Sequence, residues 1–140
     1  MKTMHSKQQG SMVLEALISI LLFSIGILAI VGLQAASIKN TASAKYRTDA
    51  SLLVNQVIGQ MWVSNKINAN LVANFSSPSG ANYVAWASSV AQALPGVSGV
   101  SANAPTIAID ASNNVTITLF WQAPGEAAAH NYTAIAVVTD

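Results

Sequence analysis

The beginning of the chain divides into a short polar segment and a long apolar one. Residues 1–10 are polar and cationic, and no charged residue occurs from Ala16 to Leu33. At about 1.5 Å per helical residue this apolar run spans roughly 27 Å, close to the ~30 Å hydrocarbon core of a bilayer. We therefore expect a single membrane-spanning helix over residues 11–33, with Glu15 as a buried acid near its start.

The helical pattern continues beyond the apolar run without a break signal, because the first proline of the chain is Pro78. We expect one helix from near Ser11 to about Leu71, with residues 34–72 as its amphipathic half. Apolar residues recur there every three or four positions, which is typical of one helix face: Tyr46, Ala50, Leu53, Val54, Val57, Ile58 and Met61. This stripe is expected to pack against the chain's own globular part, and a coiled coil with a partner is the alternative.

Residues 73–140 are expected to form a globular head that begins with a short helix. The stretch from Asn65 to Ala81 is rich in Asn, Ser, Pro and Gly and predicts a connecting loop. Asn82 is a plausible N-cap, and Pro95-Gly96 would end the helix. Its apolar face would consist of Tyr83, Trp86, Val90 and Leu94.

The last third of the chain carries strand patterns. Thr106–Ile109 is followed by a polar turn, and both Val115–Trp121 and Tyr132–Val138 alternate between apolar and polar residues. Weak strand character near Val97–Ser101 adds a possible fourth strand. We expect an α+β fold: a long N-terminal helix whose second half packs on a small antiparallel sheet of three or four strands, with one short extra helix.

Composition and charge narrow the classes of function. Charged residues make up 8% of the chain, apolar residues 52%, and the net charge is +1. The six basic residues form no cluster in the sequence, so we predict no nucleic-acid partner. The absence of cysteine excludes disulfides, thiolate metal sites and a cysteine nucleophile.

Two segments contain residue types that occur in metal or catalytic sites. Asp110-Ala-Ser-Asn-Asn114 offers oxygen ligands but lacks the second carboxylate and closing Glu of a calcium loop, so we favour a hairpin turn. His130 has Asp110 or Glu126 as possible partners, yet no nucleophile motif accompanies it, and we favour a solvated loop histidine. We predict no catalytic residue, no metal site and no cofactor, and therefore no enzyme.

The apolar run admits two ordinary interpretations. A cleaved secretory signal needs a shorter apolar core, and the only suitable site, Ala42-Ser43-Ala44, lies well past its end. A plain signal anchor explains length and hydrophobicity but predicts nothing about Gly10 or Glu15. The charges that flank the run do not decide its orientation, because basic residues stand on both sides of it.

A third interpretation comes from resemblance. The segment Gly-Ser-Met-Val-Leu-Glu from Gly10 to Glu15, followed by the apolar run, resembles the leader and N-terminal helix of type IV prepilins. The stretch from Ile25 to Met61, with Gly32-Leu33-Gln34 within it, is similar to the minor pilins called type IV pilus modification protein, PilV. The chain departs from the family pattern at Ser11, where phenylalanine is commonest.

The resemblance implies a prepilin leader over residues 1–10, cut by prepilin peptidase between Gly10 and Ser11, with N-methylation of the new Ser11 amine. It implies that Glu15 is an assembly contact. It also implies a pilin-like fold, a bacterial inner-membrane location with the head in the periplasm, and a pilus or cell-surface location after assembly. The implied partners are other minor and major pilins, the peptidase and methylase, and the inner-membrane assembly platform.

Three classes of function follow as expectations. The first is a minor type IV pilin that primes or joins a pilus used in adhesion and twitching motility. The second is a pseudopilin of a type II secretion system, whose leader chemistry is the same. The third, an anchored periplasmic hydrolase, would need a cleft in which His130 meets a nucleophile.

Overall fold

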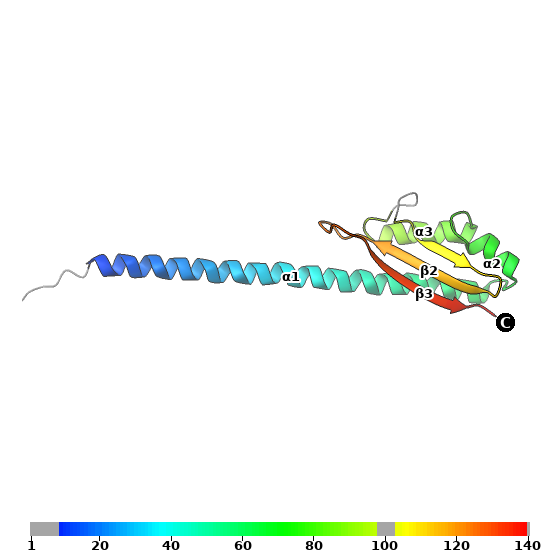
Figure 1. Cartoon of the computed structure of the whole chain (residues 1–140), viewed down its shortest axis with the longest axis horizontal. Coiled ribbons are helices and arrows are strands. Elements are labelled where there is room, and N and C mark those ends of the chain that lie inside the picture. Colours follow the sequence, from blue (N-terminus) through cyan, green and yellow to red (C-terminus); the bar gives the residue numbers. More distant parts are fainter. Residues whose placement is uncertain (1–8, 98–102, 140) are drawn as a thin grey trace, which may run out of the picture. The chain divides into compact units, whose positions relative to one another are not determined.

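The computed structural model describes residues 9–97 and 103–139, and it has the expected α+β architecture (Figure 1). The elements in chain order are α1 (Gln9–Val63), α2 (Asn68–Phe75), α3 (Ala81–Ala93), β1 (Thr106–Ile109), β2 (Asn114–Trp121) and β3 (His130–Val137). The chain divides into two compact units, residues 1–41 and 42–140. The first contains the apolar part of α1, and the second contains everything that packs into a core.

Helix α1 ends at Val63, so the expectation that one helix would continue to residue 72 is wrong at its end. Two polar side chains explain the stop. The Ser64 hydroxyl donates to the Met61 carbonyl at 2.8 Å, and the Asn65 side-chain oxygen accepts from the Ile67 amide at 3.0 Å. Such local bonds offer the backbone a turn in place of the next helical turn.

The region expected to be a loop, residues 65–81, contains the short helix α2, whose Leu71 and Phe75 are buried. The next helix, α3, is confirmed, but its N-cap is Gly80 and not Asn82. Gly80 lies so close to α2 that a Cβ there would stand 2.5 Å from the Asn74 carbonyl oxygen. Glycine at this position therefore lets α3 begin against the end of α2.

The sheet has the order β1-β2-β3, and both pairs are antiparallel. Val115, Ile117, Leu119 and Trp121 of β2 are buried while the residues between them are partly exposed, which confirms the predicted alternation. The described part of the chain thus forms three strands. The possible fourth, Val97–Ser101, lies largely outside the described residues.

The head has one hydrophobic core, formed where the three helical segments cover the inner face of the sheet (Figure 1). Five residues of the predicted stripe on α1 are buried in it, and Tyr46 and Ile58 pack against it partly buried, so packing within the chain's own head is confirmed. The fully or nearly fully buried members are Ala50, Leu53, Val54, Val57, Met61, Leu71, Phe75, Tyr83, Trp86, Val90, Leu94, Ile107, Val115, Ile117, Leu119, Trp121 and Val138.

Two buried aromatic side chains of α3 also make polar bonds to neighbouring segments. The Trp86 indole nitrogen donates to the Leu53 carbonyl oxygen of α1 at 2.9 Å. The Tyr83 hydroxyl donates to the Pro105 carbonyl oxygen, just before β1, at 2.7 Å. Burial raises the pKa of the Tyr83 phenol. Each bond satisfies a polar atom that would otherwise be buried without a partner.

We expect Trp86→Phe to lower the free energy of unfolding of the head by about 2 kcal/mol. The substitution removes one buried hydrogen bond, worth roughly 0.5–1.5 kcal/mol, and leaves unfilled volume in the core. Urea unfolding followed by circular dichroism measures it. Trp62→Phe is the matched control, because Trp62 is 44% exposed, and it should change stability by less than about 0.5 kcal/mol. Equal effects would contradict the assigned packing of Trp86.

Candidate functional site: the apolar N-terminal helix

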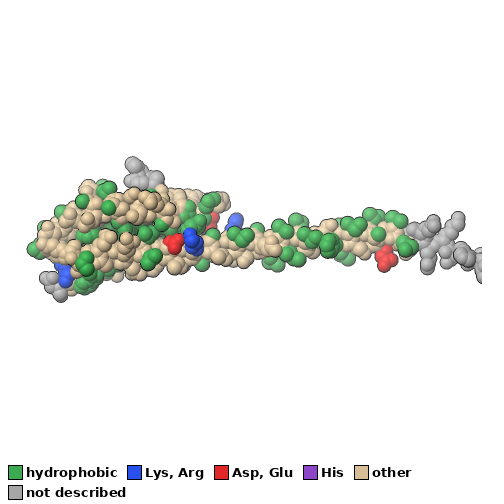
Figure 2. Space-filling model, turned by 180° about the vertical axis from the view of Figure 1, so that it is seen from behind, with side chains coloured by type: hydrophobic (Ala, Val, Ile, Leu, Met, Phe, Trp, Pro, Cys, Tyr) green, Lys and Arg blue, Asp and Glu red, His purple; other side chains and the backbone are tan. Residues whose placement is uncertain are grey.

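The apolar part of α1 is exposed on all sides within its own unit. Its most apolar window has a mean hydropathy of 2.8, and none of that window is buried. Large hydrophobic side chains from Met12 to Leu33 are between 48% and 74% exposed, without a polar face. Figure 2 shows them along this part of the helix, with one acidic side chain among them. By length and composition the helix can cross a membrane, and water is a poor solvent for it.

The residues implied by the resemblance, Gly10, Ser11 and Glu15, all lie in the first turns of α1. Helix α1 begins at Gln9, so the Gly10–Ser11 peptide bond belongs to a helical turn. Ser11 and Glu15 are four residues apart and therefore share one helix face. Glu15 forms no ion pair with any described residue. Glu15 lies beyond the first turn of α1, which is the turn where the helix dipole favours a negative charge most.

The helix is continuous through both glycines of the apolar run. Gly26 and Gly32 lie within α1, and a Cβ at either position would meet nothing within 4 Å. The Ser24 hydroxyl donates to the Ile20 carbonyl at 2.7 Å, so this polar group is satisfied inside the helix. The surface offered to lipid or to a neighbouring helix is therefore almost wholly apolar, apart from Glu15.

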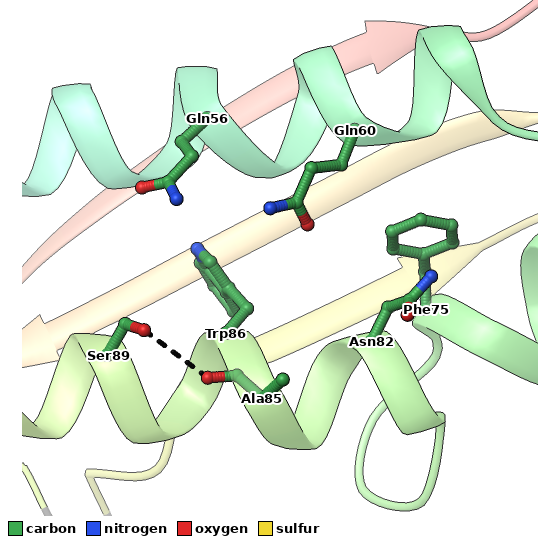
Figure 3. A pocket seen from close by; sticks show the side chains of 7 residues that line it. All are labelled: Gln56, Gln60, Phe75, Asn82, Ala85, Trp86 and Ser89. Atoms are coloured by element: carbon green, nitrogen blue, oxygen red, sulfur yellow. Dashed lines mark hydrogen bonds between the residues drawn. The ribbon is translucent and has the colours of Figure 1, made fainter.

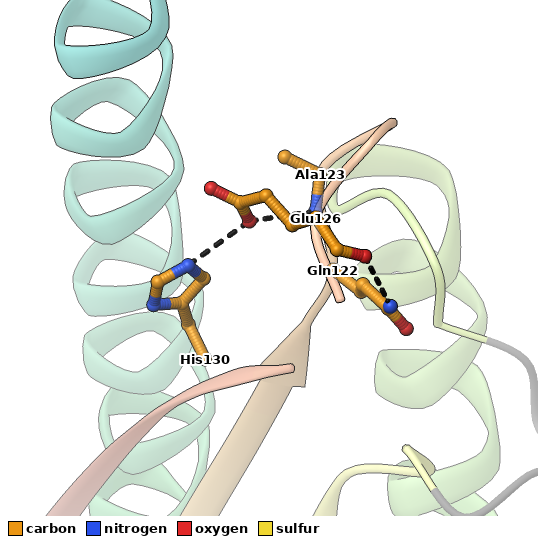
Figure 4. Close-up of polar contacts among 4 residues, drawn as sticks. All are labelled: Gln122, Ala123, Glu126 and His130. Atoms are coloured by element: carbon orange, nitrogen blue, oxygen red, sulfur yellow. Dashed lines mark hydrogen bonds and ion pairs between the residues drawn. The ribbon is translucent and has the colours of Figure 1, made fainter. Parts of the chain in front are cut away.

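In the head, the structure joins His130 to Glu126 (Figure 4). His130 begins β3, so the expectation of a loop residue is wrong, although its side chain is exposed. Its Nε2 lies 2.9 Å from Glu126 Oε2, and its ring stacks on Trp121 with centroids 5.7 Å apart. Glu126 Oε2 also accepts from the Ala123 amide at 3.3 Å. Its backbone carbonyl accepts from the Gln122 side chain at 2.8 Å.

The expectation of a hydrolase requires a nucleophile beside the His130 imidazole. Glu126 is the hydrogen-bond partner of His130, and no described serine or threonine hydroxyl bonds to the imidazole. A nucleophile within hydrogen-bond reach of the base is what acyl-transfer chemistry requires. The contacts of Glu126 instead fold the segment between β2 and β3 back on itself.

Asp110 forms a closed turn between β1 and β2, as predicted. Its Oδ1 accepts from the amides of Ser112 and Asn114 at 2.8 and 2.9 Å, and its Oδ2 accepts from the Asn114 side chain at 2.7 Å. The bond from the Asn114 side chain contributes most to lowering the pKa of the Asp110 carboxyl. Asn113 occupies the left-handed conformation, with φ of 59°. Among the described residues, no group of three His, Asp or Glu side chains could hold a metal ion.

A hollow of about 370 Å³ lies between α1 and α3, and no sequence pattern predicted it (Figure 3). Buried Phe75 and Trp86 are among the residues that line it, and its polar lining is made of neutral side chains: Gln56, Gln60, Asn82 and Ser89. No acid or base lines it, so it offers hydrogen bonding without proton transfer. It arises from the spacing between two helices, which single-sequence periodicity does not specify.

The chain was compared with family models, curated proteins and solved structures. No family model matches the chain, and no curated protein and no solved structure is significantly similar to it.

Proposed function

We propose that this chain is a minor type IV pilin, a structural subunit that primes or joins a pilus. The observation that carries the proposal is the apolar helix with a single acid at Glu15. Every side of this helix is exposed, and the same helix continues into a stripe that builds the core of a small α+β head. A subunit that leaves a bilayer to pack among identical or similar helices needs such a surface.

The acid gains a partner if the leader is removed. Cleavage between Gly10 and Ser11 by prepilin peptidase would create a cationic amine at Ser11, one helical turn from Glu15. In a filament the amine of a neighbouring subunit can pair with Glu15 and fix the axial register between helices. N-methylation of the Ser11 amine would retain its charge, since a secondary amine remains basic.

Location and partners follow from the same proposal. Before assembly the chain is a single-pass protein of the bacterial inner membrane with its head in the periplasm. It meets the peptidase, the methylase and the assembly platform there. After assembly it lies in the pilus at the cell surface, held by α1 among other minor and major pilins, where it serves adhesion or twitching motility.

Gly10→Val tests the processing step. We expect the variant to remain in the membrane as a protein about ten residues longer than wild type, because the valine side chain obstructs the close approach of the backbone to the protease that glycine permits. Gly10 also weakens the first helical turn by about 1 kcal/mol relative to alanine, which helps the bond unwind. Immunoblotting and N-terminal sequencing measure the outcome, and the mature wild type should begin Ser-Met-Val-Leu-Glu.

Gly26→Val is the matched control, since a Cβ at Gly26 meets nothing within 4 Å and the position lies away from the scissile bond. It should be processed like wild type. A mature wild-type protein that begins at Lys45, after Ala44, would instead establish a cleaved secretory signal and refute the proposal.

A further inference from the structure

The two edges of the sheet differ in how they are protected. At the β1 edge, Pro105 precedes the strand. The Ile107 amide donates to the Ser77 hydroxyl at 3.3 Å, and the Ser77 amide donates to the Ile107 carbonyl at 3.1 Å. At the other edge, β3 runs from His130 to Val137 without a lysine, a proline or a covering segment among the described residues. In Figure 1, β3 is the strand at the margin of the sheet opposite β1. Unprotected edges of this length are uncommon, because they recruit other strands.

The register of the sheet shows which main-chain groups of β3 are unpaired. Ile107 bonds outward to Ser77, so Ile107 and its partner Ile117 are a non-hydrogen-bonded pair of the antiparallel ladder. Ile117 must then bond toward β3, where its partner is Ala134. The main-chain groups of the alternate residues Thr133, Ile135 and Val137 consequently point away from the sheet. No hydrogen bond joins them to any described residue.

The side chains near this edge leave room for an added strand. The inner face of β3 presents Tyr132 and two small residues, Ala134 and Ala136, toward the side of α1. A groove of about 660 Å³ runs beside Tyr132, and the α1 residues that line it include Arg47, Ser51, Leu52 and Asn55. On the outer face Ile135 is 72% exposed and Val137 is 49% exposed. An extended segment would bury apolar surface on both of its own faces.

We propose that the β3 edge is a docking site for an extended segment of another protein, which adds to the sheet as a fourth strand. The segment alternates apolar and small polar residues and places a carboxylate beside Arg47. Arg47 is exposed on the rim of the groove and forms no ion pair with a described residue. Main-chain bonds supply affinity in this mode of recognition, and side-chain pockets supply specificity.

A second copy of the chain fits this edge less well. Its β1 edge is occupied by Ser77, so the strand it can offer is β3. From His130 to Val137, β3 carries no carboxylate that would complement Arg47. The docking of a foreign strand does not require that the chain enters a pilus, so the two proposals can fail separately.

The test uses the full chain in detergent micelles and the peptide acetyl-Glu-Val-Thr-Val-Thr-Val-Thr-Glu-amide. Amide hydrogen exchange, resolved by residue, should show new protection at Thr133, Ile135 and Val137. The amides of Ala134 and Ala136, already bonded to β2, should change little. An analogue methylated at every peptide nitrogen should not bind, because it cannot donate to the edge.

Charge exchange tests the role of Arg47. Arg47→Glu should weaken binding of the Glu-ended peptide by about fivefold, and a Lys-ended peptide should recover the loss. Lys45→Glu is the matched control, because Lys45 already pairs with Asp49 at 3.4 Å, and it should leave binding within about twofold. Absence of binding, or binding without protection of the three edge amides, would overturn the proposal. So would a dimer whose β3 amides are protected without peptide, since the occupant would then be a second copy.

Discussion

Glu15→Ala should be processed and inserted into the membrane normally, and yet be missing from sheared pili. A charge held in hydrocarbon costs on the order of 2.5–3.5 kcal/mol, and the helix N-terminus recovers only about 0.3–1 kcal/mol of this. Removing the acid therefore makes insertion easier. What the variant loses is the ion pair with the amine of a neighbouring subunit, and with it the register between helices.

The amount of subunit in membrane and sheared-pilus fractions, measured by immunoblot, decides the outcome. Glu15→Asp should give an intermediate amount, because the shorter side chain reaches less far. Asp49→Ala is the matched control, since it removes an acid that lies in the head and pairs with Lys45. It should enter pili like wild type. Normal recovery of Glu15→Ala in pili would show that the acid is not the assembly contact.

The architecture could be predicted from the sequence where one period of hydrophobicity persists over a long stretch. The apolar stripe from Ala50 to Met61 predicts which face of α1 is buried, and the alternation in β2 predicts which face of the strand is buried. The structure confirms both predictions. The predicted end of α1 was wrong, because local polar hydrogen bonds there compete with the helical pattern. Ser64 and Asn65 end α1 before the predicted boundary, although no proline or glycine stands there.

The remaining differences depend on distances between elements, which periodicity does not contain. Position 80 requires glycine because a Cβ there would collide with the Asn74 carbonyl. Helix α3 begins from this glycine, so Asn82, a residue type preferred at N-caps, is not its N-cap. His130 reaches Glu126 because the chain turns back between β2 and β3. The hollow beside Trp86 and the unprotected edge at β3 likewise appear only after the helices and strands are packed. The acid at Glu15 could be singled out from sequence, since a lone charge in an apolar run is visible there.

A fragment that begins at Ala42 should be a soluble monomer that unfolds cooperatively, because residues 42–140 form a compact unit with their own core. Size-exclusion chromatography and urea unfolding test this expectation. The fragment lacks the apolar run but keeps the whole buried stripe of α1.

A fragment that begins at Met61 should aggregate. It lacks Ala50, Leu53, Val54 and Val57, all buried, and the carbonyl that accepts from Trp86. Burying each valine or leucine is worth about 1.5–3 kcal/mol, so the loss is comparable with the whole stability of a small domain, about 5–15 kcal/mol. The inner face of the sheet would also become exposed to other chains.

Two neighbouring leucines of α1 allow core packing to be tested without shortening the chain further, in the fragment that begins at Ala42. Leu53 is 8% exposed and Leu52 is 67% exposed, so Leu53→Asp places a charge in the core while Leu52→Asp leaves it in water. We expect Leu53→Asp to cost more than about 4 kcal/mol, enough to unfold a marginal head, and Leu52→Asp to cost less than about 1 kcal/mol. Circular dichroism against urea compares them directly. Equal losses would mean that the face of α1 assigned to the core is the wrong one, because only the direction of the side chain distinguishes the two substitutions.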